Sequence, residues 1–336
     1  MKILPLLCLG LFVSSALAAG NDRPWQSLPA EVPSPAANPT SEAKVELGRM
    51  LFHDARLSES RSVSCASCHA LAEGGADHHP TSLGVHGEPN GRNALTVWNV
   101  GFLTSYYWDG RAASLEEQAR TQLLNPIDMG MQDAAYVEAR MRSIAGYQPY
   151  FERAFGVGEA VNITNIVRAI AAFERTLITP DSAYDRFVKG DKNALNEQQQ
   201  RGMTAFRAAG CGRCHQGPAF DSPSLAAETV FTMRFPSYPR SPYAATYKLI
   251  ADLGRFEWTG KEADRSQWRV PSLRNLSYTA PYMHNGLVPT LAAAVRVMGS
   301  TELSRTFTDP EVADLVAFLE ALSGPLPKVM VPTLPP

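Results

Sequence analysis

Two short segments of the chain carry cysteine and histidine in the same order and at the same spacing. Both read C-x-x-C-H, and their members are Cys65, Cys68 and His69 in one and Cys211, Cys214 and His215 in the other. This spacing lets two thiols form thioether bonds to the vinyl groups of a haem while the adjacent histidine binds the iron. Zinc knuckles and thioredoxin-like pairs are alternatives, but neither needs a histidine after each second cysteine. The motifs therefore predict two covalently bound c-type haems.

The fifth cysteine lies in a segment typical of an export signal. Lys2 precedes an apolar run from Ile3 to Val13, which contains Cys8, and the sequence Ala-Leu-Ala ends at Ala18. The apolar run is too short for a membrane span, which needs about 20 residues. We expect residues 1–18 to be removed and the mature protein to be periplasmic, without a membrane span.

Length and charge narrow the class of protein further. A chain of 336 residues is long enough for about two domains, and a net charge of −2 argues against a nucleic-acid binder. Five cysteines are too few for a disulfide-stabilised scaffold.

The elements around the two motifs repeat in order. Apolar residues at helical spacing predict a helix before each motif, over 42–52 and 198–208, and one at the end of each half, over 163–177 and 310–322. We expect Asp309 to cap the last helix. Strand patterns are scarce, so the predicted fold is mainly α, with two tandem cytochrome c-like haem domains over 42–185 and 186–324. Residues 19–41 form a Pro-rich leader, either an extended strap or flexible, and 325–336 form a Pro-rich tail.

The second axial position of each iron decides between electron transfer and reaction with a small oxidant. Candidate ligands for the second haem are Met233, Met283, Met298 and His284. Candidates for the first haem are His78, His79, His86, Met129 and Met131. Residue type alone does not choose among them, because a methionine on an apolar face commonly packs in a core.

From about Ala43 to Gly324 the sequence resembles the bacterial di-haem cytochrome c peroxidase family, which includes the MauG-like branch. The segments that carry the resemblance are Leu57–Ser58, Gly74–Asp77, Arg92–Ala94, Trp108–Arg111, Ala171–Leu177, Val270–Asn275 and Ala280–Gly286. It implies that the second haem accepts electrons, with His215 and Met298 on its two faces. The MauG-like enzymes carry tyrosine at the Met298 position, so this residue favours a peroxidase.

The resemblance also implies that the first haem reacts with peroxide. His86 matches a loop histidine that binds the iron at rest and leaves on reduction, although it stands one residue later than the family spacing. Asp128, in the segment NPIDMG, replaces the glutamate that serves the family as acid and base. Glu88 aligns with a distal glutamate of the MauG-like branch, so either carboxylate is a candidate.

Further positions match the family between the two haems. Trp108 matches a tryptophan relay, and Arg269 matches a basic residue near the haem propionates. Asn93, Thr279 and Pro281 match positions that hold Ca²⁺, which favours neutral oxygen ligands of this kind.

The resemblance implies a periplasmic enzyme that reduces hydrogen peroxide to water with electrons from a small redox protein, either a cytochrome c or a cupredoxin. Homodimers are common in the family. Two other functions remain: a MauG-like oxidase that modifies tyrosine or tryptophan of a partner protein, and a di-haem electron carrier without enzymatic activity.

Overall fold

The computed structural model describes residues 24–158, 160–221 and 231–336. The predicted export signal, 1–18, lies outside the described residues. The described chain is mostly helical, as predicted, with one small sheet in which β1 (Thr232–Arg234) pairs antiparallel with β2 (Gln267–Arg269). None of the helices in these ranges is long and apolar enough to cross a membrane.

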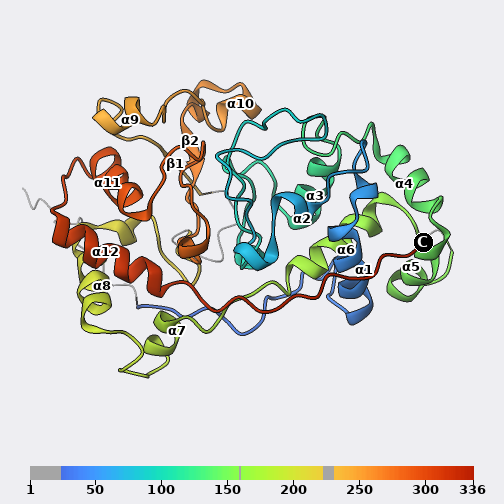
Figure 1. Ribbon diagram of the computed structural model, residues 1–336, viewed down its shortest axis with the longest axis horizontal. Helices are drawn as coiled ribbons and strands as arrows, with labels where there is room; N and C mark the ends of the chain where they lie inside the picture. Colours follow the sequence, from blue (N-terminus) through green and yellow to red (C-terminus); the bar gives the residue numbers. More distant parts are fainter. Residues whose placement is uncertain (1–23, 159, 222–230) are drawn as a thin grey trace, which may run out of the picture.

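The helices form two groups at the two ends of an elongated molecule (Figure 1). The N-terminal group consists of α1 (Glu42–His53), α2 (Cys65–Cys68), α3 (Leu115–Leu123), α4 (Ala134–Arg142), α5 (Gln148–Phe155) and α6 (Ile163–Glu174). The C-terminal group consists of α7 (Ala183–Val188), α8 (Glu197–Ala209), α9 (Pro242–Thr246), α10 (Phe256–Thr259), α11 (Leu291–Glu302) and α12 (Asp309–Ala321). Single 3₁₀ turns follow α1 and α8, and the second, η5 (Cys211–Arg213), carries the second motif. Each group encloses its own cluster of buried apolar side chains.

One helix crossing recurs in both groups. In the first, α1 packs on α6, and a Cβ atom at Gly48 would lie 1.9 Å from the carbonyl oxygen of Ala169. In the second, α8 packs on α12, and a Cβ atom at Gly202 would lie 1.9 Å from the carbonyl oxygen of Asp314. Only glycine permits this approach of two helix backbones, so the two halves share one frame.

The helices begin where polar side chains cap them. Ser41 caps α1, Asn162 caps α6 and Asn196 caps α8. The prediction that Asp309 caps the last helix was wrong: Asp309 lies in its first turn, and Thr308 accepts a hydrogen bond from the backbone N–H of Glu311.

The helix predicted to reach Leu177 ends at Glu174, because the backbone then forms two tighter turns. The N–H groups of Thr176 and Leu177 each bond to the carbonyl three residues before them.

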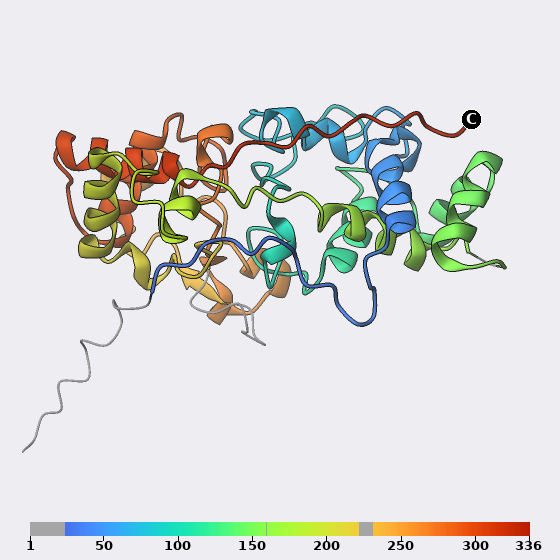
Figure 2. The same cartoon turned by 90° about the horizontal axis from the view of Figure 1, so that it is seen from below.

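The leader and the tail both run from the C-terminal half to the N-terminal half (Figure 2). Trp25 lies among the aromatic rings of the C-terminal half, whereas Asn38 bonds to Glu116 in the N-terminal half. The tail leaves α12 and runs back, and the Pro335 carbonyl accepts a hydrogen bond from Arg56. The described part of the leader, 24–41, is therefore an extended strap, and both chain ends connect the two halves.

Candidate active site

The first C-x-x-C-H motif opens into a cavity of about 360 Å³ in the N-terminal half. Cys65, Cys68 and His69 form part of its wall, and α3 and α6 supply the opposite parts. Its polar lining includes Asn90, Gln118, Gln122, Asn125, Asp128 and Glu174. Within the described residues, His69 is the only histidine that lines this cavity.

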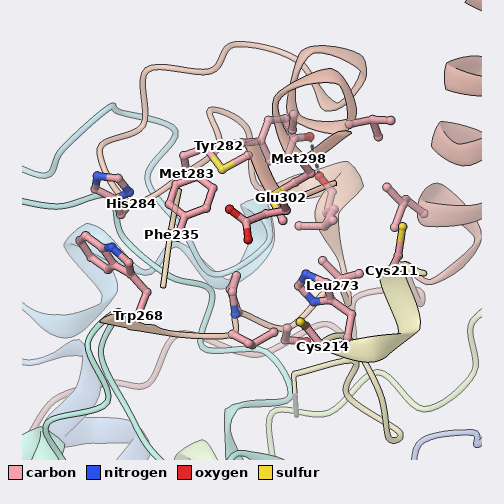
Figure 3. Close-up of a pocket in the computed structure, with 18 of the residues that line it drawn as sticks. Cys211, Cys214, Phe235, Trp268, Leu273, Tyr282, Met283, His284, Met298 and Glu302 are labelled. Carbon is pink, nitrogen blue, oxygen red and sulfur yellow. Dashed lines mark hydrogen bonds between the residues drawn. The ribbon is translucent and has the colours of Figure 1, made fainter. Parts of the chain in front are cut away.

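The second motif lines a cavity of about the same volume, 360 Å³, in the C-terminal half. Met298 and Met283 lie in the upper part of Figure 3 and Cys214 in the lower part. The wall also contains Met233, Phe235, Trp268 and leucines of α11 and α12. Both cavities are therefore lined mostly by apolar groups, and the first differs from the second in carrying more amide and carboxyl side chains.

Both motif histidines are held in the same way. The Nδ1 atom of His69 lies 3.1 Å from the carbonyl oxygen of Gly75, and that of His215 lies 3.0 Å from the carbonyl oxygen of Phe220. A backbone carbonyl at Nδ1 fixes that nitrogen as the N–H donor and leaves Nε2 as the ligand atom. Burial lowers the pKa of both rings, which favours the neutral form that binds metal.

The cysteine environment separates haem attachment from a dithiol redox site. The four described cysteines form no disulfide. Burial raises the pKa of Cys65 to about 12 and that of Cys211 to about 11. Redox-active C-x-x-C pairs have lowered thiol pKa values, so these thiols are poor candidates for dithiol exchange.

Trp108 and Arg269 line both cavities and separate them. The indole Nε1 of Trp108 donates to the carbonyl oxygen of Asn93 at 2.9 Å, and the backbone N–H of Arg269 donates to the carbonyl oxygen of Trp108. The Arg269 side chain is 5% exposed and donates to the carbonyl oxygens of Tyr107 and Val270. A buried guanidinium that bonds to neutral carbonyls here fits the carboxylates of haem propionates.

These features fit the haem group on chemical grounds. Each cavity presents the two thiols and the imidazole of its own motif at its wall, and the buried Arg269 lines both cavities. The residues present therefore match the donor set that a c-type haem requires.

Of the two predicted acid–base candidates, Asp128 and Glu88, only the first lines the cavity. Asp128 lines the first cavity, and its Oδ1 accepts a hydrogen bond from Asn90 at 3.3 Å. Burial raises the pKa of this carboxyl. Glu88 is half-buried and does not line the cavity.

His86 also lies outside the first cavity. Its side chain is 60% exposed, and Nε2 lies 3.7 Å from a carboxylate oxygen of Glu59. Ligation of the first haem would require the loop around Gly84 and Gly87 to move inward. Gly87 has φ 82° and nothing within 4 Å of a Cβ position, so that part of the loop has free space around it.

The three predicted calcium residues, Asn93, Thr279 and Pro281, all line the second cavity, and Asn93 also lines the first. The Asn93 Nδ2 group donates hydrogen bonds to the carbonyl oxygens of His79 and Pro80. The amide nitrogen is therefore bonded to backbone, and Oδ1 is left as a ligand atom for a cation.

Among the buried residues, Trp268 and Glu174 had no role assigned from sequence, and His284 was a candidate ligand of the second haem. Trp268 stacks on His284 with ring centroids 4.2 Å apart, and neither the Trp268 Nε1 nor the His284 Nε2 has a hydrogen-bond partner. Glu174 lines the first cavity at 5% exposure. Its position could have been found from the helix register, because residue 174 lies four after Ile170 on the apolar face.

The comparisons with known proteins agree with this geometry. A family model described as di-haem cytochrome c peroxidase matches residues 42–193. The chain is 40% identical to a cytochrome c551 peroxidase of Nitrosomonas europaea, over 100% of this chain and 94% of the relative. The chain belongs to the di-haem cytochrome c peroxidase family.

Other members of the family lie further away. The methylamine utilization protein MauG of Methylorubrum extorquens is 36% identical over 91% of this chain and 86% of its own length. Among solved structures, a MauG-like protein associated with microbial copper homeostasis superposes with a TM-score of 0.77 at 31% identity, covering 88% of this chain and 95% of that one. Family membership implies haem cofactors, and the two cavities are where the motifs place them.

Proposed function

We propose that this protein is an exported di-haem cytochrome c peroxidase that reduces hydrogen peroxide to water with electrons from a small redox protein. One observation carries the proposal: two cavities of matched volume each present one C-x-x-C-H motif and share Trp108 and Arg269 as their common wall. In this proposal the two halves are tandem cytochrome c-like domains. The names of the relatives support the choice of peroxide as substrate.

The chain would hold each haem in the same manner. Cys65 and Cys68, and in the other half Cys211 and Cys214, form the thioether bonds, and the Nε2 atoms of the two motif histidines bind iron. Each haem, when bound, would supply one-electron chemistry, and the iron held by His69 would supply a binding place for peroxide. Arg269 would balance propionate charge between the two groups.

The two cavities would have different roles, with electrons entering at the second and peroxide reacting at the first. Met298 lines the second cavity and is the proposed thioether ligand there, which suits a centre that accepts electrons at high potential. Trp108 lies against both cavities and is the proposed relay. Its indole is oriented by the hydrogen bond to the carbonyl oxygen of Asn93.

Asp128 would be the general acid–base group of the reaction. A general acid–base group must accept a proton from one peroxide oxygen and return it to the other. Burial raises the pKa of Asp128, so it holds a proton more readily than an exposed aspartate. Asn90 donates to Oδ1 and orients the carboxyl.

We also propose a bound Ca²⁺ ion and a periplasmic location for this protein. Asn93, Thr279 and Pro281 would bind Ca²⁺ through neutral oxygens where the two halves meet. The export signal over 1–18 places the mature enzyme in the periplasm, where its donor would be a cytochrome c or a cupredoxin and where it would form a homodimer.

The purified holoprotein tests the function directly. Half-reduced protein, with one electron in the second haem, is mixed with hydrogen peroxide in a stopped-flow spectrometer, and turnover is followed with a reduced cytochrome c as donor. We expect peroxide-dependent oxidation of the donor, with two donor molecules oxidised per peroxide. Persistent low-spin spectra of both haems and no peroxide consumption would instead identify an electron carrier.

A further inference from the structure

The same helix position carries different residues in the two halves. Because Ala169 and Asp314 occupy matching places at the two glycine crossings, residue 170 corresponds to 315 and residue 174 to 319. Ile170 and Leu315 each line their cavity. At the next turn, Leu319 lines the second cavity, whereas Glu174 lines the first. The frame thus accepts leucine here, and the first half carries a carboxyl instead.

Glu174 is buried without the partners that a structural carboxylate needs. Its side chain is as buried as that of Leu319, at 5% and 7% exposure, and its Oε2 has no hydrogen-bond partner in the part of the chain that the structure describes. A buried polar atom left unbonded costs about 1–3 kcal/mol, and leucine at this position would avoid that cost. The carboxyl therefore weakens the fold locally, which points to a role in the cavity.

The groups around Glu174 could balance a change in its charge. Arg175 donates through one arm to Glu116 at 2.7 Å, while its other arm, NH1, is buried without a partner. The titratable or charged groups facing the carboxyl are Arg175 directly after α6, Glu116 on α3, Cys65 on α2 and Tyr106 in the loop before α3. The thiol of Cys65 is consumed in haem attachment, and Tyr106 stays neutral, because burial raises its pKa beyond the accessible range. The free arm of Arg175 remains as the group that can stabilise a Glu174 carboxylate.

We propose that Glu174 is a redox-linked protonation site of the first cavity, binding a proton when that cavity gains an electron and releasing it when the electron leaves. This inference rests on the proposed function, because the electron comes from the donor protein through the second half. In the reductive step one electron enters, one proton arrives from solvent, and an O–H bond forms at the carboxylate. In the oxidative step that O–H bond breaks and the carboxylate faces the free arm of Arg175.

The expected pH range follows from the environment of the carboxyl. Burial raises the pKa of Glu174 to about 8. Well below this value Glu174 is protonated in both redox states, and the potential of the first haem does not depend on pH. As the pH rises through about 8, the oxidised state loses the proton first. The potential then falls with pH, by at most about 59 mV per unit, the one-electron equivalent of a tenfold change.

The test is a redox titration of the holoenzyme at several pH values between 6 and 10, read from the absorption of each haem. We expect the slope for the first haem in the wild-type protein and its loss in Glu174→Gln, which keeps the shape of the side chain. Glu174→Leu copies the residue of the other half and should also lose the slope. The second haem of the same molecules, next to Leu319, is the internal control and should be unaffected by either substitution.

A second measurement identifies the group that takes the proton. Redox-difference infrared spectra near pH 8 should show a carboxylic-acid carbonyl band on reduction, absent in Glu174→Gln and retained in Asp128→Asn. A slope that survives in Glu174→Gln, or a band lost only in Asp128→Asn, would overturn the inference. Loss of the first haem's signal in the wild-type protein would instead contradict the proposed function.

Discussion

The two cavities are built on one frame but are lined for different chemistry. Both lie beside a glycine-mediated helix crossing, and both hold their motif histidine through a backbone carbonyl at Nδ1. Both have a mostly apolar lining, but the first also carries two carboxyls, Asp128 and Glu174, and six amide side chains, whereas the second carries three methionines, one carboxyl and one amide. A repeated fold therefore fixes where the two haems go, while a few lining residues decide what each one does.

Carboxyls show the contrast most clearly. In the second cavity Glu302 accepts two hydrogen bonds from Ser237, one from the backbone N–H at 2.9 Å and one from the hydroxyl at 2.8 Å. In the first cavity the Asn90 and Gln122 side chains bond to Asp128, and Oε2 of Glu174 has no hydrogen-bond partner among the described residues. Hydrogen bonds hold Glu302 in place, whereas the unbonded oxygen of Glu174 is available for proton transfer.

The largest expected effect comes from removing the proposed acid–base group of the first cavity. Asp128→Asn should lower the peroxidase rate by about 10²–10⁴-fold, the usual contribution of a positioned acid–base group. Because Glu88 does not line the cavity, Glu88→Gln should lower it far less. Steady-state rates with matched haem content measure both variants. A large loss in Glu88→Gln with little change in Asp128→Asn would transfer the role to Glu88.

The shared frame can be broken equally in either half. Gly48→Ala and Gly202→Ala would each place a methyl group 1.9 Å from a carbonyl oxygen of the partner helix. We expect each to lower the free energy of unfolding by about 3 kcal/mol, the upper part of the range for overpacking. Gly91→Ala, where nothing lies within 4 Å, is the control. Urea unfolding of the holoprotein measures the effect, and stability close to wild type in either variant would show that the crossing can relax.

The sequence predicted the features that depend only on residues close together in the chain, namely the haem-attachment motifs and the main helices. The C-x-x-C-H motifs place all ligand-bearing atoms within five residues, so the motifs could be recognised without knowing the fold. The helices at 42, 163, 198 and 310 were found to within three residues at each end, because their apolar faces repeat. The error at Asp309 has a local cause, since Thr308 also precedes the apolar run and forms a capping box with Glu311.

Residues whose role depends on long-range packing could not be placed in this way. Only the fold shows that Asp128 lines the first cavity while Glu88 and His86 do not. The helix register puts Glu174 on the apolar face of α6, but only the fold shows that this residue lines the first cavity. The strap formed by residues 24–41 depends on where Trp25 packs, among the aromatic rings of the other end of the molecule.

A smaller effect is expected from the sulfur ligand of the second cavity. Three methionines line this cavity, and substituting them one at a time identifies the one that binds iron. Met298→Ala should lower the potential of the second haem by at least about 59 mV, a tenfold change in the equilibrium, and leave the first haem unchanged. Met283→Ala is the matched control, and a larger shift in that variant would reassign the ligand. Separate potentiometric titration of the two haems distinguishes these outcomes.

The smallest effect should come from removing one of the two hydrogen bonds that Ser237 donates to Glu302. Ser237→Ala removes the hydroxyl bond to Glu302 but keeps the backbone bond, so we expect a loss of about 1 kcal/mol in unfolding free energy. Burial raises the pKa of Glu302, and with one bond fewer this pKa should rise further. If bonding is what separates the two carboxyls, the potential of the second haem should then become more dependent on pH in Ser237→Ala than in wild type. A pH dependence identical to wild type would show that Glu302 stays out of the redox chemistry even when partly released, and that position, more than bonding, distinguishes it from Glu174.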